Sequence, residues 1–122
     1  MKETVLLINF SDKQRLQQVK QALIPLRLRL RSVEPSEYDC PVGLLAEGKA
    51  MEGAAVPEPL NGELLVFAGF SGGTLDRVLA ALRKHQLRIP YKAMLTASNQ
   101  NWTVRQLHRE IQAEHEAMTG GQ

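Results

Sequence analysis

The sequence predicts a small α/β domain of three layers. In it, two β-α-β units form a four-stranded, mostly parallel sheet with the strand order 2-1-3-4. Two observations predict this class. Residues 4–10 (TVLLINF) and 63–70 (ELLVFAGF) are short apolar runs without strict alternation, which is typical of strands buried on both faces. Each run is followed by an amphipathic helical pattern and then by a second strand pattern, which is the order of a β-α-β unit.

The first unit continues from residue 11. Residues 11–24 have apolar side chains at helical spacing, and Pro25 ends this helix. Residues 26–33 alternate leucine with arginine before a closing Ser-Val, and that period of two predicts a strand with one solvated face.

The connection between the units spans residues 34–61. Residues 42–50 (VGLLAEGKA) predict a short helix, and residues 51–59 predict a loop. If this connection crosses over, the sheet is parallel, and the two central strands, 4–10 and 63–70, run in the same direction. If it turns back, the alternative is a ferredoxin-like α+β sheet with one bare face. We favour the crossover, because neither central strand alternates.

The second unit repeats the order of the first. Its strand, helix, strand and final helix are predicted at residues 63–70, 74–86, 91–96 and 104–118. The domain is therefore predicted to span residues 1–118, with a disordered tail at 119–122. The two units also resemble each other in sequence, since LLINFSDKQRLQQVKQAL aligns with LVFAGFSGGTLDRVLAAL. Either a duplication or two units that obey the same rules explains this likeness.

The composition narrows the class of protein. The 122 residues suit one domain, and 43% hydrophobic with 23% charged residues is the profile of a globular protein. A formal net charge of +2 argues against a nucleic-acid partner. The single cysteine, Cys40, fits a reducing cytoplasm, and no apolar run approaches the length that crosses a membrane. We expect a cytoplasmic protein with neither cofactor nor metal.

Gly69-Phe70-Ser71-Gly72-Gly73 matches G-x-S-x-G between a predicted strand and a predicted helix, the context of the hydrolase nucleophile elbow. The chain is short for such an enzyme, and no histidine follows on a suitable loop. The first unit has the same Phe-Ser pair, so Ser71 and Ser11 are better interpreted as helix N-caps. An anion-binding role for Ser71, Gly72 and Gly73 at the helix start remains a second interpretation.

Residues 91–107 (YKAMLTASNQNWTVRQL) contain a second set of polar residues. Thr103 is the predicted N-cap of the last helix, and Trp102 is predicted to pack on Leu107 as a hydrophobic staple. Thr96, Asn99 and Asn101 follow the carboxyl end of a strand, where parallel sheets bind ligands. Turn chemistry is the competing and favoured interpretation of these three residues.

The arginines and histidines indicate a functional site less strongly than these two polar segments do. Arg27, Arg29 and Arg31 are predicted to share one face of a strand, either as a partner surface with exposed Trp102 or as the solvated edge of a sheet. His108 and His115 are seven residues apart on the last helix. That spacing is too long for one metal ion, so a solvated helix face is predicted.

A family resemblance covers about half of the chain. ELLVFAGFSGGTLDRVLAALRK and IPYKAMLTASNQNWTVRQLHREIQAEHE resemble the bacterial family catalogued as domain of unknown function 3783. The most specific segment is Lys92-Ala93-Met94-Leu95-Thr96, followed by Asn101-Trp102-Thr103. The Gly72-Gly73 pair departs from the family's pattern, in which polar or acidic residues are more usual at these positions. The family has no assigned activity, so the resemblance implies a fold unit and not a reaction.

These observations favour a small binding or interaction module without catalytic activity, acting as a homo-oligomer or on a protein partner. The alternative is a hydrolase-like enzyme or anionic-ligand sensor that uses Ser71 and the loop at residues 96–103.

Overall fold

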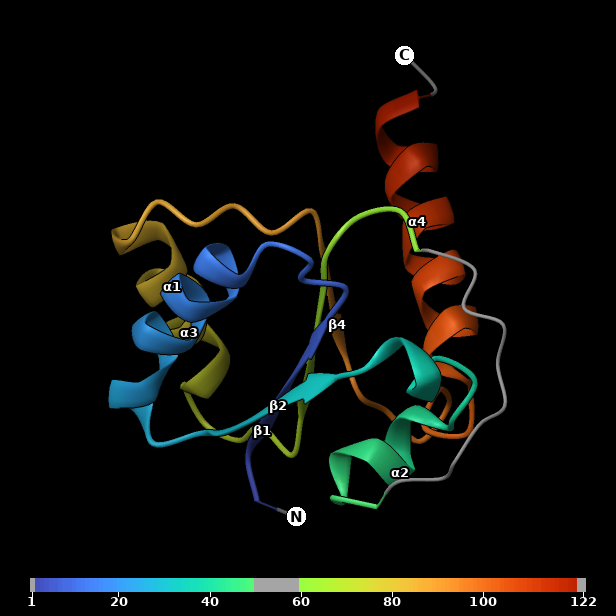
Figure 1. Cartoon of the computed structure of the whole chain (residues 1–122), viewed down its shortest axis with the longest axis horizontal. Helices are drawn as coiled ribbons and strands as arrows, with labels where there is room; N and C mark the ends of the chain where they lie inside the picture. Colours follow the sequence, from blue (N-terminus) through green and yellow to red (C-terminus); the bar gives the residue numbers. More distant parts are fainter. Residues whose placement is uncertain (1, 50–59, 121–122) are drawn as a thin grey trace.

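The computed structural model describes residues 2–49 and 60–120 of the chain (Figure 1). Its strands and helices are β1 (Thr4–Ile8), α1 (Lys13–Leu23), β2 (Arg29–Val33), α2 (Val42–Ala46), β3 (Leu64–Ala68), α3 (Thr74–Lys84), β4 (Tyr91–Met94) and α4 (Val104–Gly120). Two short 3-10 turns, Ile24–Leu26 and Pro35–Glu37, follow α1 and β2. The loop predicted at residues 51–59 lies outside the described residues. α4 reaches Gly120, beyond the predicted start of the tail, and residues 121–122 also lie outside the described residues.

The sheet has the predicted order, β2-β1-β3-β4, and two of its three strand pairs are parallel. The prediction for the central pair is wrong, because β1 and β3 run antiparallel, with Leu6 opposite Val66. β3 starts beside the end of β1, where the Asn9 side chain donates to the carbonyl oxygens of Leu60 and Gly62 at 2.9 and 3.0 Å. An apolar strand is buried equally well in either direction, so its pattern predicts burial and not orientation.

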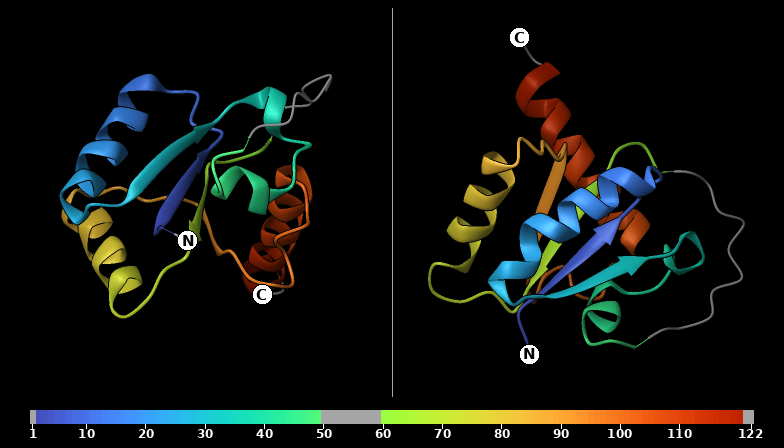
Figure 2. Two further views of the ribbon diagram at one scale, coloured as in Figure 1. Left: turned by 90° about the horizontal axis from the view of Figure 1, so that it is seen from below. Right: turned by 60° about the vertical axis from the view of Figure 1, so that its left-hand side comes forward.

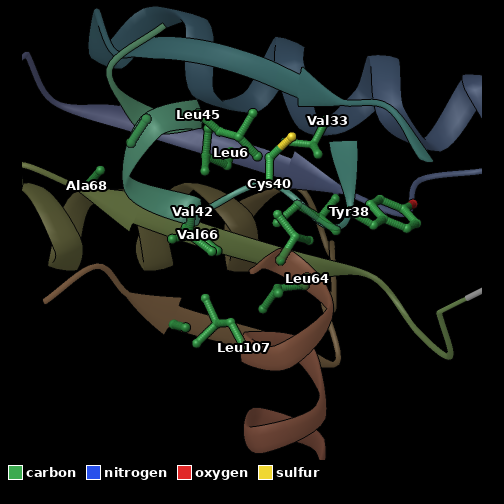
Figure 3. Packing of buried hydrophobic residues seen from close by; sticks show 14 residues of the cluster. Leu6, Val33, Tyr38, Cys40, Val42, Leu45, Leu64, Val66, Ala68 and Leu107 are labelled. Carbon is green, nitrogen blue, oxygen red and sulfur yellow. The ribbon is translucent and has the colours of Figure 1, made fainter. Parts of the chain in front are cut away.

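Helices cover both faces of the sheet, which confirms the three layers (Figure 2). On one face, α1 and α3 pack against Val5, Leu7, Leu65 and Phe67. On the other, α2 and α4 pack against the alternate residues, and Figure 3 shows Leu6 and Leu64 of the sheet beside Val42 of α2 and Leu107 of α4. A ferredoxin-like sheet with one bare face is therefore excluded.

The architecture explains the internal likeness of the sequence. β1-α1-β2-α2 and β3-α3-β4-α4 have the same order and the same parallel strand pair, and they meet through the antiparallel β1–β3 pair. The starts of α2 and α4 also bond reciprocally. The Val42 N–H donates to the Trp102 carbonyl at 2.8 Å, and the Val104 N–H donates to the Cys40 carbonyl at 3.2 Å. The repeat therefore includes the helix that ends each half, which the sequence comparison did not detect.

Two predicted helix caps are wrong. α1 is capped by Asp12 rather than Ser11, and the Asp12 carboxylate accepts the backbone N–H groups of Gln14 and Arg15. α3 has Gly73 and not Ser71 at its N-cap position. Both serines lie one or two residues too early in the chain to cap the helix that follows.

Candidate functional site

Ser71, Gly72 and Gly73 lie at the start of α3, and a carboxylate of the protein itself occupies this helix terminus. The Ser71 N–H donates to Glu3 Oε2 at 3.0 Å, and the Thr74 hydroxyl donates to the same oxygen. These two hydrogen bonds, from Thr74 first and Ser71 second, lower the pKa of Glu3 below its ordinary value. The Ser71 N–H that was predicted to face an external anion thus donates to Glu3 instead.

The polar residues after β4 bond mainly to one another. The Thr96 N–H donates to Asn99 Oδ1 at 2.8 Å, the Asn99 N–H donates to Thr96 Oγ1 at 3.2 Å, and the Asn99 amide donates to the Met94 carbonyl at 3.0 Å. Asn101 is exposed. This is the turn chemistry that we favoured for the segment.

The predicted helix cap at Thr103 is confirmed, because the Thr103 hydroxyl accepts a hydrogen bond from the Gln106 N–H at 3.1 Å. Trp102 is partly buried and packs against the core between the sheet and the α2–α4 layer, which also contains Leu107. The ring thus packs on the core as the staple interpretation predicted, but it is only partly buried rather than largely buried.

The hydrolase alternative requires a histidine beside Ser71, and the fold separates the two. Ser71 follows the end of β3, whereas His85 lies at the far end of α3, about 16 Å away for a helix of this length. His108 lies at the other end of β3, where its Nε2 is 3.0 Å from the Gly62 carbonyl oxygen. His115 lies further along α4, away from Ser71. The positions of the histidines argue against a triad at Ser71.

The two histidines of α4 flank the Tyr91 ring at centroid distances of 5.3 Å for His108 and 5.4 Å for His115, both edge-on. His108 is only 2% exposed, so the predicted solvated face is wrong for this residue. Its short contact with the Gly62 carbonyl places the ring proton on Nε2. His108 therefore supports the turn that leads into β3. Within residues 2–49 and 60–120, no cluster of three metal-ligating side chains occurs.

The arginine stripe is divided among different contacts. Arg31 pairs with Glu37 at 2.7 Å and donates to the Leu45 carbonyl at 2.6 Å, which closes the end of α2. The Arg29 guanidinium lies against Gly48. Arg27 precedes β2 in a left-handed conformation, with φ of 60°. Only part of the predicted partner surface is thus free to meet another molecule.

A groove that the sequence did not predict lies between α3 and β4. It has a volume of about 540 Å³ and is open to solvent. Its apolar wall comes from Leu79 and Leu82 of α3 and from Leu87 and Ile89 of the segment that connects α3 to β4. We call this cavity the α3–β4 groove. The signal in the sequence is Leu87-Arg88-Ile89, where apolar residues interrupt a connection that would otherwise be polar.

The rim of the α3–β4 groove is mainly basic. Arg83, Arg88 and Lys92 line it together with one acid, Asp76. The Lys92 ammonium donates to the Ile89 carbonyl at 2.9 Å, which holds this cation at the mouth. Arg15 of α1 donates to the Arg88 carbonyl, and the first half of the chain thereby supports the connecting segment.

A second, smaller groove of about 250 Å³ lies on the other face of β4, between that strand and α4. Tyr91, Ile111, His115 and Met118 line it, and Lys92 lines both grooves. β4 is an edge strand of the sheet, so this edge is flanked by a groove on each face.

The fold and these cavities define a small α/β domain with a groove on each face of one sheet edge. Residues 63–118 match the family model described as "Domain of unknown function (DUF3783)", which confirms the resemblance over the second half of the chain. No curated protein and no solved structure matches the chain. In the described part of the chain, every helix is too short or too polar to cross a membrane.

Proposed function

We propose that this protein is a cytoplasmic interaction module, without a catalytic step, whose α3–β4 groove binds an acidic amphipathic helix of a protein partner. One observation carries the proposal: an apolar groove with a basic rim. Leu79 is partly exposed in this groove, and Leu87 and Ile89 form its largely buried apolar floor, against which apolar side chains of a partner can pack. An open groove beside a helix suits a helical segment, whose apolar stripe fits between two elements.

The charge of the rim selects the partner. Three cations and one anion, Asp76, leave an excess of two positive charges around an apolar wall. A segment with glutamate or aspartate beside its apolar stripe complements that pattern, whereas a basic segment is repelled. Nucleic acid is a poorer fit, because the groove offers aliphatic side chains and no aromatic ring on which a base stacks.

Two synthetic helical peptides test the proposal. Both have leucine at helical spacing; one has glutamate on its polar positions and the other has lysine. In a ¹⁵N NMR titration we expect the acidic peptide to shift the amides of Leu79, Leu87, Ile89 and Lys92, and the basic peptide to leave them unchanged. Added salt should weaken the binding, since the rim charges are exposed.

The matched variants are Arg88→Glu at the rim and Lys49→Glu, which lies beyond α2 on the other side of the sheet. Arg88→Glu should weaken the acidic peptide about tenfold at low salt, and Lys49→Glu should bind it like the wild type. Equal binding of both peptides, or shifts centred away from the groove, would reject the proposal.

A further inference from the structure

The C-terminal part of α4 extends beyond the sheet (Figure 1). Val104 and Leu107 in the first turns are buried in the core, whereas residues 113–118 are all exposed, and Met118 is 78% exposed. We call residues 110–118 the α4 arm. A helix that leaves its own core with a large apolar side chain near its end presents a surface that a partner can bury.

The arm has the chemistry that the α3–β4 groove is proposed to select. Ile111, His115 and Met118 are spaced as one helical stripe, and the first two already contact the core or the Tyr91 ring. The same segment, EIQAEHEAM, contains three glutamates and neither lysine nor arginine. An acidic amphipathic arm and a basic apolar groove therefore occur in one chain.

The arm does not reach its own groove. Both lie at the end of β4 where Pro90 and Lys92 are found, but they lie on opposite faces of the sheet. A two-fold axis parallel to the β4 edge brings the α4 face of one copy beside the α3 face of another. Each arm then enters the groove of the other copy, and the contact closes as a dimer rather than growing into a chain.

We propose that the chain forms such a dimer, in which the α4 arm of each copy fills the α3–β4 groove of its partner. This inference rests on the proposed function, because it names the segment that the groove binds. The reciprocal contact pairs the cations Arg83, Arg88 and Lys92 with the arm glutamates twice in each dimer. Met118 is covered in the same contact.

Sedimentation equilibrium of the full chain tests the dimer with two charge-reversed variants. The groove variant combines Arg83→Glu with Arg88→Glu, and the arm variant combines Glu110→Lys with Glu114→Lys. Each should raise the dimer dissociation constant about tenfold or more, because each substitution acts twice. Lys49→Glu is the charge control. Met118→Ser should also weaken the dimer, and Ile24→Ser, which changes a side chain 59% exposed elsewhere, should not.

Mixing the two reversed variants gives the sharpest result. The groove variant has an acidic groove and an acidic arm, and the arm variant has a basic groove and a basic arm, because two lysines then outnumber the one remaining glutamate, Glu116. Neither should self-associate, but a one-to-one mixture should form a heterodimer in which both contacts are complementary. Circular dichroism of each variant checks that these exposed substitutions leave the fold intact.

The outcomes separate this inference from the proposed function. A monomeric wild type whose groove still binds the acidic peptide would overturn the dimer alone. A dimer that the reversed variants leave unchanged would overturn it as well, since its contact would lie elsewhere. A monomer that binds neither peptide would reject both.

Discussion

Replacement of Gly43 by alanine tests how closely the starts of α2 and α4 approach. Inside a helix, glycine is less favourable than alanine by about 1 kcal/mol, so Gly43→Ala would ordinarily stabilise the protein. Here a Cβ at position 43 would lie 2.9 Å from the backbone oxygen of Gln100 and 3.1 Å from its Cβ. The Gly43 N–H donates to that same oxygen at 2.9 Å, so the two segments cannot separate without losing the bond.

The net effect follows from these opposing contributions. Forcing a methyl group into a packed contact costs about 1–3 kcal/mol. Weakening one backbone hydrogen bond costs about 1 kcal/mol more. After the helix preference of alanine is subtracted, we expect Gly43→Ala to lower the free energy of unfolding by about 2 kcal/mol.

Urea unfolding of the wild type and the variant measures this difference. Gly73→Ala is the matched control, because a Cβ there meets nothing closer than the Arg77 guanidinium at 3.8 Å. It should lower the stability by less than about 1 kcal/mol, because alanine is a poorer residue than glycine at this N-cap position but makes no steric clash there. A Gly43→Ala protein as stable as the wild type would refute the close approach of α2 to the segment before α4.

Three further predictions concern the residues predicted from the sequence and Glu3, which the structure places beside Ser71. Glu3→Gln should destabilise the protein at neutral pH. Because the folded pKa of Glu3 lies below its ordinary value of 4.5, the wild-type advantage should be complete above that pH and should be lost as pH falls through the folded pKa, which urea melts between pH 3 and 7 would follow. Trp102→Ala should cost about 2 kcal/mol and Thr103→Ala about 1 kcal/mol in the same assay, since the ring is partly buried and the hydroxyl caps α4. Ser71 should not be labelled by a fluorophosphonate probe, and labelling that disappears in Ser71→Ala would overturn this expectation.

The sequence predicted the order of the strands because the information is local. The unbroken apolar runs of β1 and β3 require burial on both faces, and this places them at the centre of the sheet with β2 and β4 at its edges. The direction of β3 was not predictable in this way. It depends on contacts such as that of Asn9 with the carbonyl of Gly62, which joins residues 53 positions apart.

The features of the candidate site that could be predicted are likewise those that depend on neighbouring residues in the sequence. The cap at Thr103 was predictable, because a hydroxyl and the N–H three residues later are neighbours in the chain. The carboxylate at the start of α3 was not, because Glu3 is 68 residues from Ser71. The burial of His108 was missed for the same reason, since its partner Gly62 is 46 residues away in the sequence.

The family match and the two halves of the fold bear on the position of the proposed binding surface. Residues 63–118 include β3, α3, β4 and most of α4, and therefore the whole α4 arm and the whole α3–β4 groove. The first half provides the partner strand β1 and the support of Arg15, which pairs with Glu63 at 2.7 Å and also holds the Arg88 carbonyl. Without that half, β3 would lose its partner β1 and expose an unpaired edge of backbone N–H and C=O groups. The first half thus acts as the scaffold for a surface built by the second, which is why the proposed binding chemistry lies within the segment that the family model matches.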